Sequence, residues 1–250
     1  MRPVIPESHP RYFSLMTREK LVEGFRKGIV VPEGLIAHGR GEAFDYIFGE
    51  RTRDFAVKAQ RAAVALMLLS RKPVISVNGN AAALVAEELA EFSEVLKVPL
   101  EVNVFHWSRE RVERIAEFLM EKGCKNVLFA GDAVIEGIEH ARRIVDSRGI
   151  YSADTVMVML EDGDRCEILR KSGKKVVAID LNPLSRTARM ADVTVVNNVT
   201  RAVPEMVELA REMRRMNREE LERIVKEYDN DATLREALKA IASLGASKVP

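Results

Sequence analysis

Six short runs of apolar residues recur along the middle of the chain and predict strands. They are rich in valine and isoleucine, and most are continuous rather than alternating with polar residues. Continuous apolar runs are typical of strands buried on both faces, as in parallel sheets. The six runs span residues 73–77, 100–105, 126–130, 155–160, 175–179 and 193–196.

Helical patterns separate these runs. AAALVAEELAEFSEVL and SRERVERIAEFLMEKG both place apolar residues at helical spacing. The second begins at Ser108, a favourable N-cap residue, and ends at Gly123. Strands that alternate with helices predict right-handed βαβ units. We therefore expect an α/β fold with a doubly wound, mainly parallel sheet of about six strands.

Both ends of the chain read as helical extensions of this core. TREKLVEGFRKG and RDFAVKAQRAAVALMLLS predict helices before the first strand, and the chain is helical again from about residue 205. Near the C-terminus, Leu221, Ile224, Val225 and Tyr228 form an apolar stripe that either docks on the core or meets a partner subunit. We expect one domain over 1–250, with a helical part at 1–70, the core at 71–204 and C-terminal helices at 205–250.

Charge and composition narrow the function classes. The formal net charge is +1, from 39 basic and 38 acidic residues, which argues against a nucleic-acid binder; the local run REMRRMNRE reads as a solvated helix face. There is no signal-peptide pattern and no run of about 18 apolar residues, so we expect a cytoplasmic protein that does not span a membrane. Cys124 and Cys166 form no CxxC, so neither a zinc site nor a disulfide framework is indicated.

Polar residues follow each predicted strand. In open α/β sheets, ligands bind beyond the carboxyl ends of the strands, so these residues are candidates for a site. Taken alone, each turn also has a simpler explanation than a binding site, because any buried strand must leave the sheet through a polar turn. The turns are Asn78-Gly79-Asn80, His106, Gly131-Asp132, Glu161 to Asp164, Asp180-Leu181-Asn182 and Asn197-Asn198.

The turn after 175–179 has the parts of a nucleotide site. Ser185 is placed to cap a short helix that begins near Arg186, and the free N–H groups of such a helix favour phosphate. The Arg186 guanidinium grips phosphate oxygens bidentately, and Asp180 and Asn182 suit ribose or base edges. The alternative is that Asp180 caps a turn and that Arg186 and Arg189 form a solvated face.

No GxGxxG fingerprint follows any strand. Asn78-Gly79-Asn80 offers a single glycine before small residues, which lets a ligand approach the backbone; otherwise it is a tight turn with Asn80 as helix N-cap. GLIAHGRGEAFDYI predicts a glycine-rich turn that exposes Arg40 on a mobile or strained loop. It lacks the ending of a Walker A motif. A lone histidine such as His106 is more often structural than catalytic.

Four long segments carry a resemblance to a known family. PEGLIAHGRGEAFDYIFGE, PVISVNGNAAAL, LEDGDR and AIDLNPLSRTARMADVTVVNNVTRAVP occur in this order and resemble the archaeal phosphopantothenate synthetases. The resemblance runs from about Ile5 to Met213. It implies a Rossmann-like homodimer that uses ATP to condense 4-phosphopantoate with β-alanine in coenzyme A biosynthesis. The products it implies are 4'-phosphopantothenate, AMP and pyrophosphate, formed through an acyl-adenylate.

The resemblance also implies site residues. The positions it assigns to ATP are Arg18, Arg40, Asp180, Leu181, Asn182, Arg186, Thr187, Asn198 and Val199. We expect Mg²⁺ with the triphosphate, without assigned protein ligands, and interpret Arg40, Arg186 and His106 as catalytic. Asn78, Gly79 and Asn80 are expected to bind the phosphorylated substrate. Asp162 or Asp164 is a candidate to orient the β-alanine amine or to hold Mg²⁺ through water.

Two other functions stay open from the residues. An NAD-dependent oxidoreductase is disfavoured by the absent GxGxxG. A nucleotide-sensing module would bind ATP without consuming it.

Overall fold

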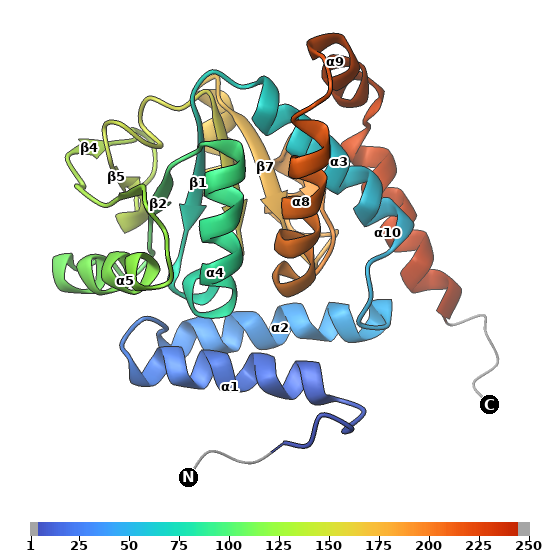
Figure 1. The fold of residues 1–250 in the computed structure, drawn as a ribbon, viewed down its shortest axis with the longest axis horizontal. Helices are drawn as coiled ribbons and strands as arrows, with labels where there is room; N and C mark the ends of the chain where they lie inside the picture. Colours follow the sequence, from blue (N-terminus) through green and yellow to red (C-terminus); the bar gives the residue numbers. More distant parts are fainter. Residues whose placement is uncertain (1–4, 245–250) are drawn as a thin grey trace.

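The computed structural model describes residues 5–244, and a six-stranded parallel sheet lies at their centre (Figure 1). Its strand order is β3-β2-β1-β6-β7-β8, with every neighbouring pair parallel. From β1 the chain adds β2 and β3 on one side and then β6, β7 and β8 on the other. This is the order of a Rossmann-like doubly wound sheet, so the predicted fold class is confirmed. The strands are β1 (Pro73–Val77), β2 (Leu100–Val102), β3 (Val127–Leu128), β6 (Thr155–Met159), β7 (Lys175–Ile179) and β8 (Val193–Val195).

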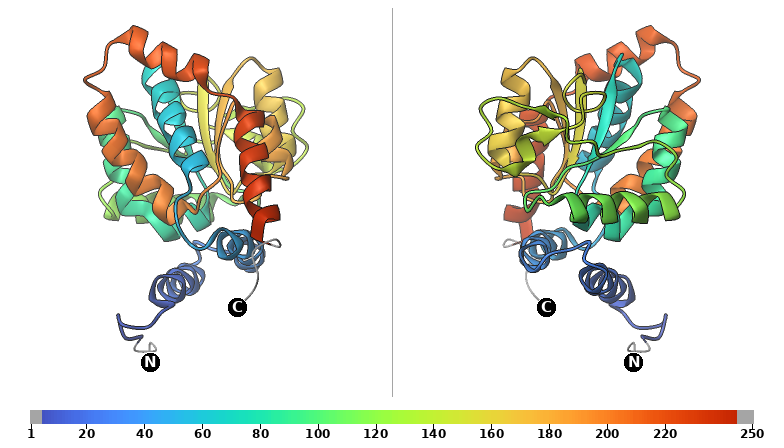
Figure 2. Two further views of the ribbon diagram at one scale, coloured as in Figure 1. Left: turned by 90° about the vertical axis from the view of Figure 1, so that its right-hand side faces the viewer. Right: turned by 90° about the vertical axis from the view of Figure 1, so that its left-hand side faces the viewer.

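Helices cover both faces of the sheet, as the continuous apolar runs predict. Along β6, Met157 and Met159 face the core shared with α3, α4, α5 and α8, while Val156 and Val158 face the core shared with α6. Figure 2 shows the two helical layers with the sheet between them. The bounds are α3 (Asp54–Leu69), α4 (Gly79–Leu96), α5 (Arg109–Glu121), α6 (Gly163–Lys171), α7 (Arg186–Met190) and α8 (Val199–Met213).

A small hairpin between β3 and β6 was not predicted. β4 (Ala133–Val134) pairs antiparallel with β5 (Ile144–Val145), and a 3₁₀ turn at Ala141–Arg143 precedes β5. Two-residue strands leave no readable apolar period in the sequence. The segment nevertheless contributes Ile135, Val145 and Ile150 to the core on the α6 side of the sheet.

Two N-terminal helices lie at the carboxyl ends of the strands. α2 (Pro32–Phe48) runs across this end, and α1 (Tyr12–Arg26) lies beyond it (Figure 1). α2 is attached to the start of α4 because Asn80 Nδ2 donates to the Gly34 carbonyl at 2.7 Å. A Cβ at Gly34 would lie 2.5 Å from Asn80 Oδ1, so glycine permits this approach.

The prediction of a glycine-rich turn around Arg40 was wrong, because the whole segment is helical. Pro32 stands at the start of α2, and Gly49 ends the helix with a left-handed φ of 85°. These are ordinary start and stop signals. Gly34, Gly39 and Gly41 weaken the helix intrinsically, but packing against the strand ends outweighs that weakness.

The C-terminal helices pack on the core, which decides between the two interpretations of the apolar stripe. Leu221, Ile224, Val225 and Tyr228 all contact the main hydrophobic core. α9 (Arg218–Glu227) packs against α3, and α10 (Asn230–Leu244) against α3, α7 and β8. The Asn230 side-chain oxygen accepts a hydrogen bond from the Thr194 N–H of β8 at 2.8 Å. Residues 245–250 of the predicted C-terminal part, and residues 1–4, lie outside the described chain.

None of the helices between residues 5 and 244 combines the length and the apolar character needed to cross a membrane.

Candidate functional site

A pocket of about 410 Å³ opens where the carboxyl ends of β1, β2 and β6 meet α2. This is the point at which the strand order reverses, where ligands bind in open α/β sheets. Its size lies within the range of small-molecule sites. The lining residues that matter for chemistry are Arg40, Asn78, Gly79, Asn80, His106, Arg111, Arg142 and Asp162.

Two arginines, Arg142 buried and Arg111 half-buried, line this pocket. Arg111, in the first turn of α5, donates to the carbonyls of His106 at 2.9 Å and Ile29 at 3.0 Å. Arg142 is held by Glu161, at 3.2 Å, and by Asp162. Burial lowers the pKa of Arg111, and the positive charge of Arg142 lowers it further. Two guanidinium groups that line one pocket are suited to a multiply charged anion, although Arg142 is also paired with Glu161 and Asp162.

The N-terminus of α4 forms the floor of the pocket. Asn78, rather than Asn80, is the N-cap: its side-chain oxygen accepts from the Ala81 N–H at 3.0 Å, and its amide donates to the Met159 carbonyl at 2.7 Å. Gly79 is required because a Cβ there would lie 2.1 Å from the Ile29 carbonyl oxygen. The free N–H groups of this helix add positive potential beside the two arginines.

The segment after β7 folds into a self-supporting loop. Asp180 accepts from the Asn182 N–H at 2.9 Å and from the Ser185 hydroxyl, while Asn182 accepts from the Leu184 N–H. Ser185 caps α7, as predicted, by accepting from the Ala188 N–H at 2.9 Å. Burial raises the pKa of Asp180, and these hydrogen bonds oppose the shift. The Asp180 carboxylate therefore stabilises the shape of its own loop.

The two residues that follow this cap point in different directions. The Arg186 side chain is 56% exposed and pairs with Glu167. Thr187 is buried, and its hydroxyl donates to the Glu161 carbonyl at 2.9 Å. Arg186 is therefore available to a ligand in exchange for its partner, whereas Thr187 joins α7 to the turn after β6.

Asn198 attaches α8 to α2. Its amide donates to Asp45 at 2.8 Å, and its oxygen accepts from the Thr200 N–H. Arg201 also pairs with Asp45. Asn198, Val199 and Leu181 line a narrow gap under α2. Asn198 also borders an open hollow of about 540 Å³ between α1 and the start of α8.

The remaining predicted residues are spread around these features. Arg40 is exposed on α2, lines the 410 Å³ pocket and has no acidic partner within residues 5–244. His106 lies at the rim, 48% exposed, with Nε2 3.9 Å from the Glu33 carboxylate. Arg18 is exposed on α1 and lines neither the pocket at the strand ends nor the neighbouring hollows.

The acidic candidates are already engaged. Asp162 lines the pocket, with one oxygen 2.9 Å from Arg142 Nε, and burial raises its pKa. Asp164 contacts His140 Nε2 at 3.0 Å. Within the described chain, no three His, Cys, Asp or Glu side chains form a group suited to a metal ion. The residues present do not form a ready-made Mg²⁺ site.

Arg111 and Arg142 were missed as functional residues by the reasoning from sequence, and Glu161 was named only within the polar turn after 155–160, without a role of its own. The position of Arg111 in the first turn of the helix after β2 was a usable signal, because that turn faces the carboxyl ends of the strands. Arg142 had no comparable signal, since it reaches the pocket from the unpredicted hairpin segment.

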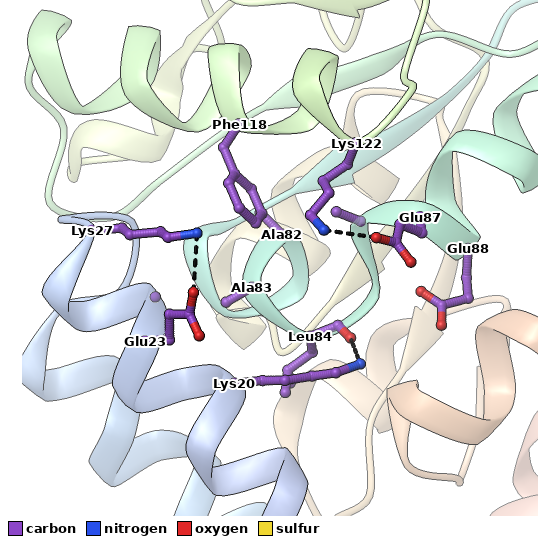
Figure 3. A pocket seen from close by; sticks show the side chains of 12 residues that line it. Lys20, Glu23, Lys27, Ala82, Ala83, Leu84, Glu87, Glu88, Phe118 and Lys122 are labelled. Atoms are coloured by element: carbon purple, nitrogen blue, oxygen red, sulfur yellow. Dashed lines mark hydrogen bonds and ion pairs between the residues drawn. The ribbon is translucent and has the colours of Figure 1, made fainter. Parts of the chain in front are cut away.

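Another hollow, of about 170 Å³, lies between α1, α4 and α5 and is shown in Figure 3. Three lysines border it, but each has a partner: Lys20 donates to the Leu84 carbonyl, Lys27 pairs with a glutamate on its own helix, and Lys122 pairs with Glu87. It shares no lining residue with the pocket at the strand ends.

Comparisons with known proteins converge on one family. A family model described as phosphopantothenate/pantothenate synthetase matches residues 55–244. The 4-phosphopantoate–β-alanine ligase of Thermococcus kodakarensis is 56% identical over 236 residues, which cover 94% of this chain and 90% of the relative. The enzyme of the same name from Methanosarcina mazei is 50% identical over 238 residues, which cover 95% of this chain and 94% of the relative. That of Methanospirillum hungatei is 48% identical over 238 residues, which cover 95% of this chain and 96% of the relative.

Proposed function

The chain belongs to the phosphopantothenate/pantothenate synthetase family, and from this premise we propose that it is an ATP-dependent ligase that joins 4-phosphopantoate to β-alanine. The products are 4'-phosphopantothenate, AMP and pyrophosphate, in coenzyme A biosynthesis. The observation that carries the proposal is a pair of arginines, the half-buried Arg111 and the buried Arg142, that line one pocket beside the start of α4. We also propose that residues 1–250 act as one ligase unit in the cytoplasm.

The phosphate of 4-phosphopantoate binds between Arg111 and Arg142. A phosphate dianion matches two guanidinium forks and the N–H groups at the start of α4, including the Asn78-Gly79-Asn80 turn. Arg40, on the opposite wall, attracts the substrate carboxylate or the triphosphate. His106 lies at the rim and contributes to the same cradle.

ATP binds beside this pocket, along the turns after β7 and β8. Asp180, Leu181 and Asn182 form the ribose and base side, and Asn198 and Val199 lie at the neighbouring strand end. Arg186 exchanges Glu167 for phosphate oxygens, and Thr187 fixes the helix that carries it. Arg18 on α1 is included in the proposed set, although it lines none of the four hollows described above.

The reaction then proceeds in two displacements. A carboxylate oxygen of 4-phosphopantoate attacks the α-phosphorus of ATP, the bond to the β-phosphate oxygen breaks, and pyrophosphate leaves. The β-alanine nitrogen, as the free amine, next attacks the acyl carbon, loses a proton and displaces AMP. Arg40 and Arg186 stabilise the charge that develops on the phosphates. The chain has no P-loop lysine to draw the γ-phosphate forward, which favours attack at the α-phosphorus.

Asp162 is the better of the two acidic candidates for orienting the β-alanine amine, because it lines the pocket whereas Asp164 contacts His140. Mg²⁺ is expected to accompany ATP. Since the described residues form no cation site of their own, no step is assigned to a protein-bound metal.

We propose that the working form is a homodimer. Among the described residues, five of the large exposed apolar side chains lie on α1 and α2: Phe13, Phe25, Ile36, Tyr46 and Ile47. Exposed apolar groups on neighbouring helices are a candidate interface, and a twofold dimer would pair these helices with those of a second copy.

The decisive experiment incubates the protein with ATP, 4-phosphopantoate and β-alanine and measures AMP. AMP release that requires both organic substrates is expected. Binding of ATP without AMP release would favour the nucleotide-sensing alternative and overturn the ligase assignment. Heavy oxygen in the 4-phosphopantoate carboxylate then tests the route, since α-phosphorus attack transfers one labelled oxygen to AMP. Label in inorganic phosphate with ADP would instead show an acyl-phosphate.

A further inference from the structure

The turn after β6 joins the substrate pocket to the proposed nucleotide segment. Leu160, its first residue, has a left-handed φ of 52° and lines both the 410 Å³ pocket and the narrow gap beside Leu181. A left-handed conformation is unfavourable for a residue other than glycine, because its Cβ approaches the following carbonyl oxygen. Backbone strain of this kind persists where the surrounding structure enforces it and is common at functional sites. Here it coincides with a buried, charged side chain at the next position.

That side chain is Glu161, which is only 1% exposed and contacts two arginines at once. Its carboxylate lies 3.2 Å from Arg142 Nη1, is hydrogen bonded to Arg165 Nη1, and accepts from the Asp162 N–H at 2.8 Å. Arg165 is completely buried, and the Arg142 side chain is 7% exposed. Glu161 is therefore the carboxylate that both guanidinium groups share, and without it both charges would lose their common partner.

The same residue reaches the nucleotide side through its backbone. The Glu161 carbonyl accepts the hydrogen bond from the buried hydroxyl of Thr187. Two positions after Glu161, Gly163 packs directly against Arg186, the residue before Thr187: a Cβ at Gly163 would lie 2.4 Å from Arg186 Cβ. One residue thus touches the pocket wall with its side chain and α7 with its main chain.

We propose that Glu161 is a positioning residue that holds Arg142 in the orientation needed to bind the phosphorylated substrate. This inference rests on the proposed function and adds a residue that does not itself touch a substrate. A guanidinium in a pocket wall faces the ligand in a fixed direction only if its other donors are held. Glu161 supplies such an acceptor to Arg142 Nη1, and the Asn103 carbonyl supplies a weaker one at 3.5 Å. Asp162 lies 2.9 Å from Arg142 Nε as an ion-pair partner, without the geometry of a hydrogen bond.

The test uses Glu161→Gln, which keeps the shape and an acceptor for the Asp162 N–H but removes the charge. Calorimetric titration is expected to show 4-phosphopantoate affinity reduced by about tenfold or more, with ATP affinity within about twofold of wild type. The KM for 4-phosphopantoate should rise in parallel. Glu136→Gln, on the exposed hairpin segment, removes a charge elsewhere and should change neither value.

A second variant distinguishes positioning from a merely structural ion pair. On an Arg142→Gln background, Glu161→Gln should cause no further loss of 4-phosphopantoate affinity, because Glu161 acts through Arg142. Additive losses would overturn the proposal. Should the loss of a buried charge prevent folding, Glu161→Asp keeps the charge but withdraws it from Arg142, and the same selective loss is expected.

The outcomes separate this inference from the proposed function. A wild-type protein that binds 4-phosphopantoate but releases no AMP overturns the ligase assignment alone. An active wild type, with a folded Glu161 variant that binds 4-phosphopantoate equally well, overturns the positioning role alone. A wild type that does not bind 4-phosphopantoate overturns both.

Discussion

Arg111 and Arg142 are close enough that the charge of Arg142 adds to the effect of burial in lowering the pKa of Arg111. They come from distant parts of the chain, the first turn of α5 and the hairpin segment before β5, and meet only at the pocket wall. A dianion bound between them would relieve their mutual repulsion. The affinity of this pocket should therefore depend on both guanidinium groups and on the number of charges that the ligand carries.

Replacing Arg111 with lysine should raise the KM for 4-phosphopantoate by about tenfold or more, with little change in the KM for ATP. A lysine retains the charge but cannot also donate to the His106 and Ile29 carbonyls. Steady-state kinetics with each substrate varied in turn measures the effect. Arg109→Lys, on the same helix but outside the pocket, serves as the control. Equal rises in both KM values would place Arg111 outside the substrate cradle.

Arg186→Lys should weaken ATP binding by about tenfold or more, because a point charge cannot replace a bidentate fork. Isothermal titration with ATP measures this loss. Arg189→Lys makes the same exchange three residues later on α7 and is expected to bind ATP normally. Unchanged binding by the Arg186 variant would remove that residue from the site.

Gly163→Ala should weaken ATP binding by displacing Arg186, since the new methyl group would overlap the Arg186 side chain. We expect at least a threefold loss of ATP affinity, on the order of 0.7 kcal/mol. Gly39→Ala is the matched control, because a Cβ there meets no atom within 4 Å. Equal ATP affinities in the two variants would show that Arg186 tolerates the displacement.

Glu101 should make the folded protein less stable as the pH rises. Burial raises the pKa of Glu101 from 4.5 to about 7, so the folded state holds this proton more tightly than the unfolded chain. Its contribution to the free energy of unfolding is complete below pH 4.5 and is lost as the pH rises through about 7. The full change is on the order of 3 kcal/mol.

Urea unfolding of the wild type and of Glu101→Gln at pH 5 and pH 8 checks this contribution. The wild type should lose more stability than the variant between the two values, because glutamine does not ionise. The same pH dependence in both proteins would show that Glu101 ionises normally when buried.

Sedimentation should give twice the 28.1 kDa mass of one chain at micromolar concentration. Ile36→Glu, which places a charge on the exposed apolar surface of α2, should shift the equilibrium toward the monomer. Met120→Glu introduces the same charge at an exposed apolar position on α5, outside the proposed interface, and should leave the mass unchanged. A wild-type protein with the mass of one chain would contradict the proposed homodimer.

The sheet was predictable because its signal is local. Each strand is a continuous run of branched apolar residues, and every such run became a strand, although the ladder of 100–105 ends at Val102 and that of 126–130 covers only Val127–Leu128. α2 was missed because three glycines suggested a turn, whereas Pro32 and Gly49 mark the two ends of a helix. Its stability comes from tertiary contacts that a local pattern does not contain.

The candidate site was predictable in part for the same reason. Because the strands are parallel, their carboxyl ends all lie at one edge of the sheet. Asn78 and the Asp180 loop were therefore expected at that edge. The sequence did not predict which of these side chains face the pocket, because that depends on their hydrogen-bond partners in the fold. The Asp180 carboxylate, for example, accepts a hydrogen bond from Ser185 within its own loop. The proposed roles of Arg142 and Glu161 depend on the hydrogen bond between their side chains, and the two residues are nineteen positions apart in the sequence. A local pattern does not reveal such a contact.

The hydrogen bond from Thr194 to Asn230 has a consequence for solubility. β8 is an outer strand, and a free N–H on such a strand is a template on which another chain can add. Asn230 and the Tyr228 hydroxyl both accept from this N–H, and α10 packs against β8. The last helix thereby protects the sheet against edge-to-edge aggregation, a role separate from chemistry. A chain cut after Glu227 would keep every proposed substrate contact, yet it would leave the Thr194 N–H and carbonyl at the edge of the sheet without these side-chain partners.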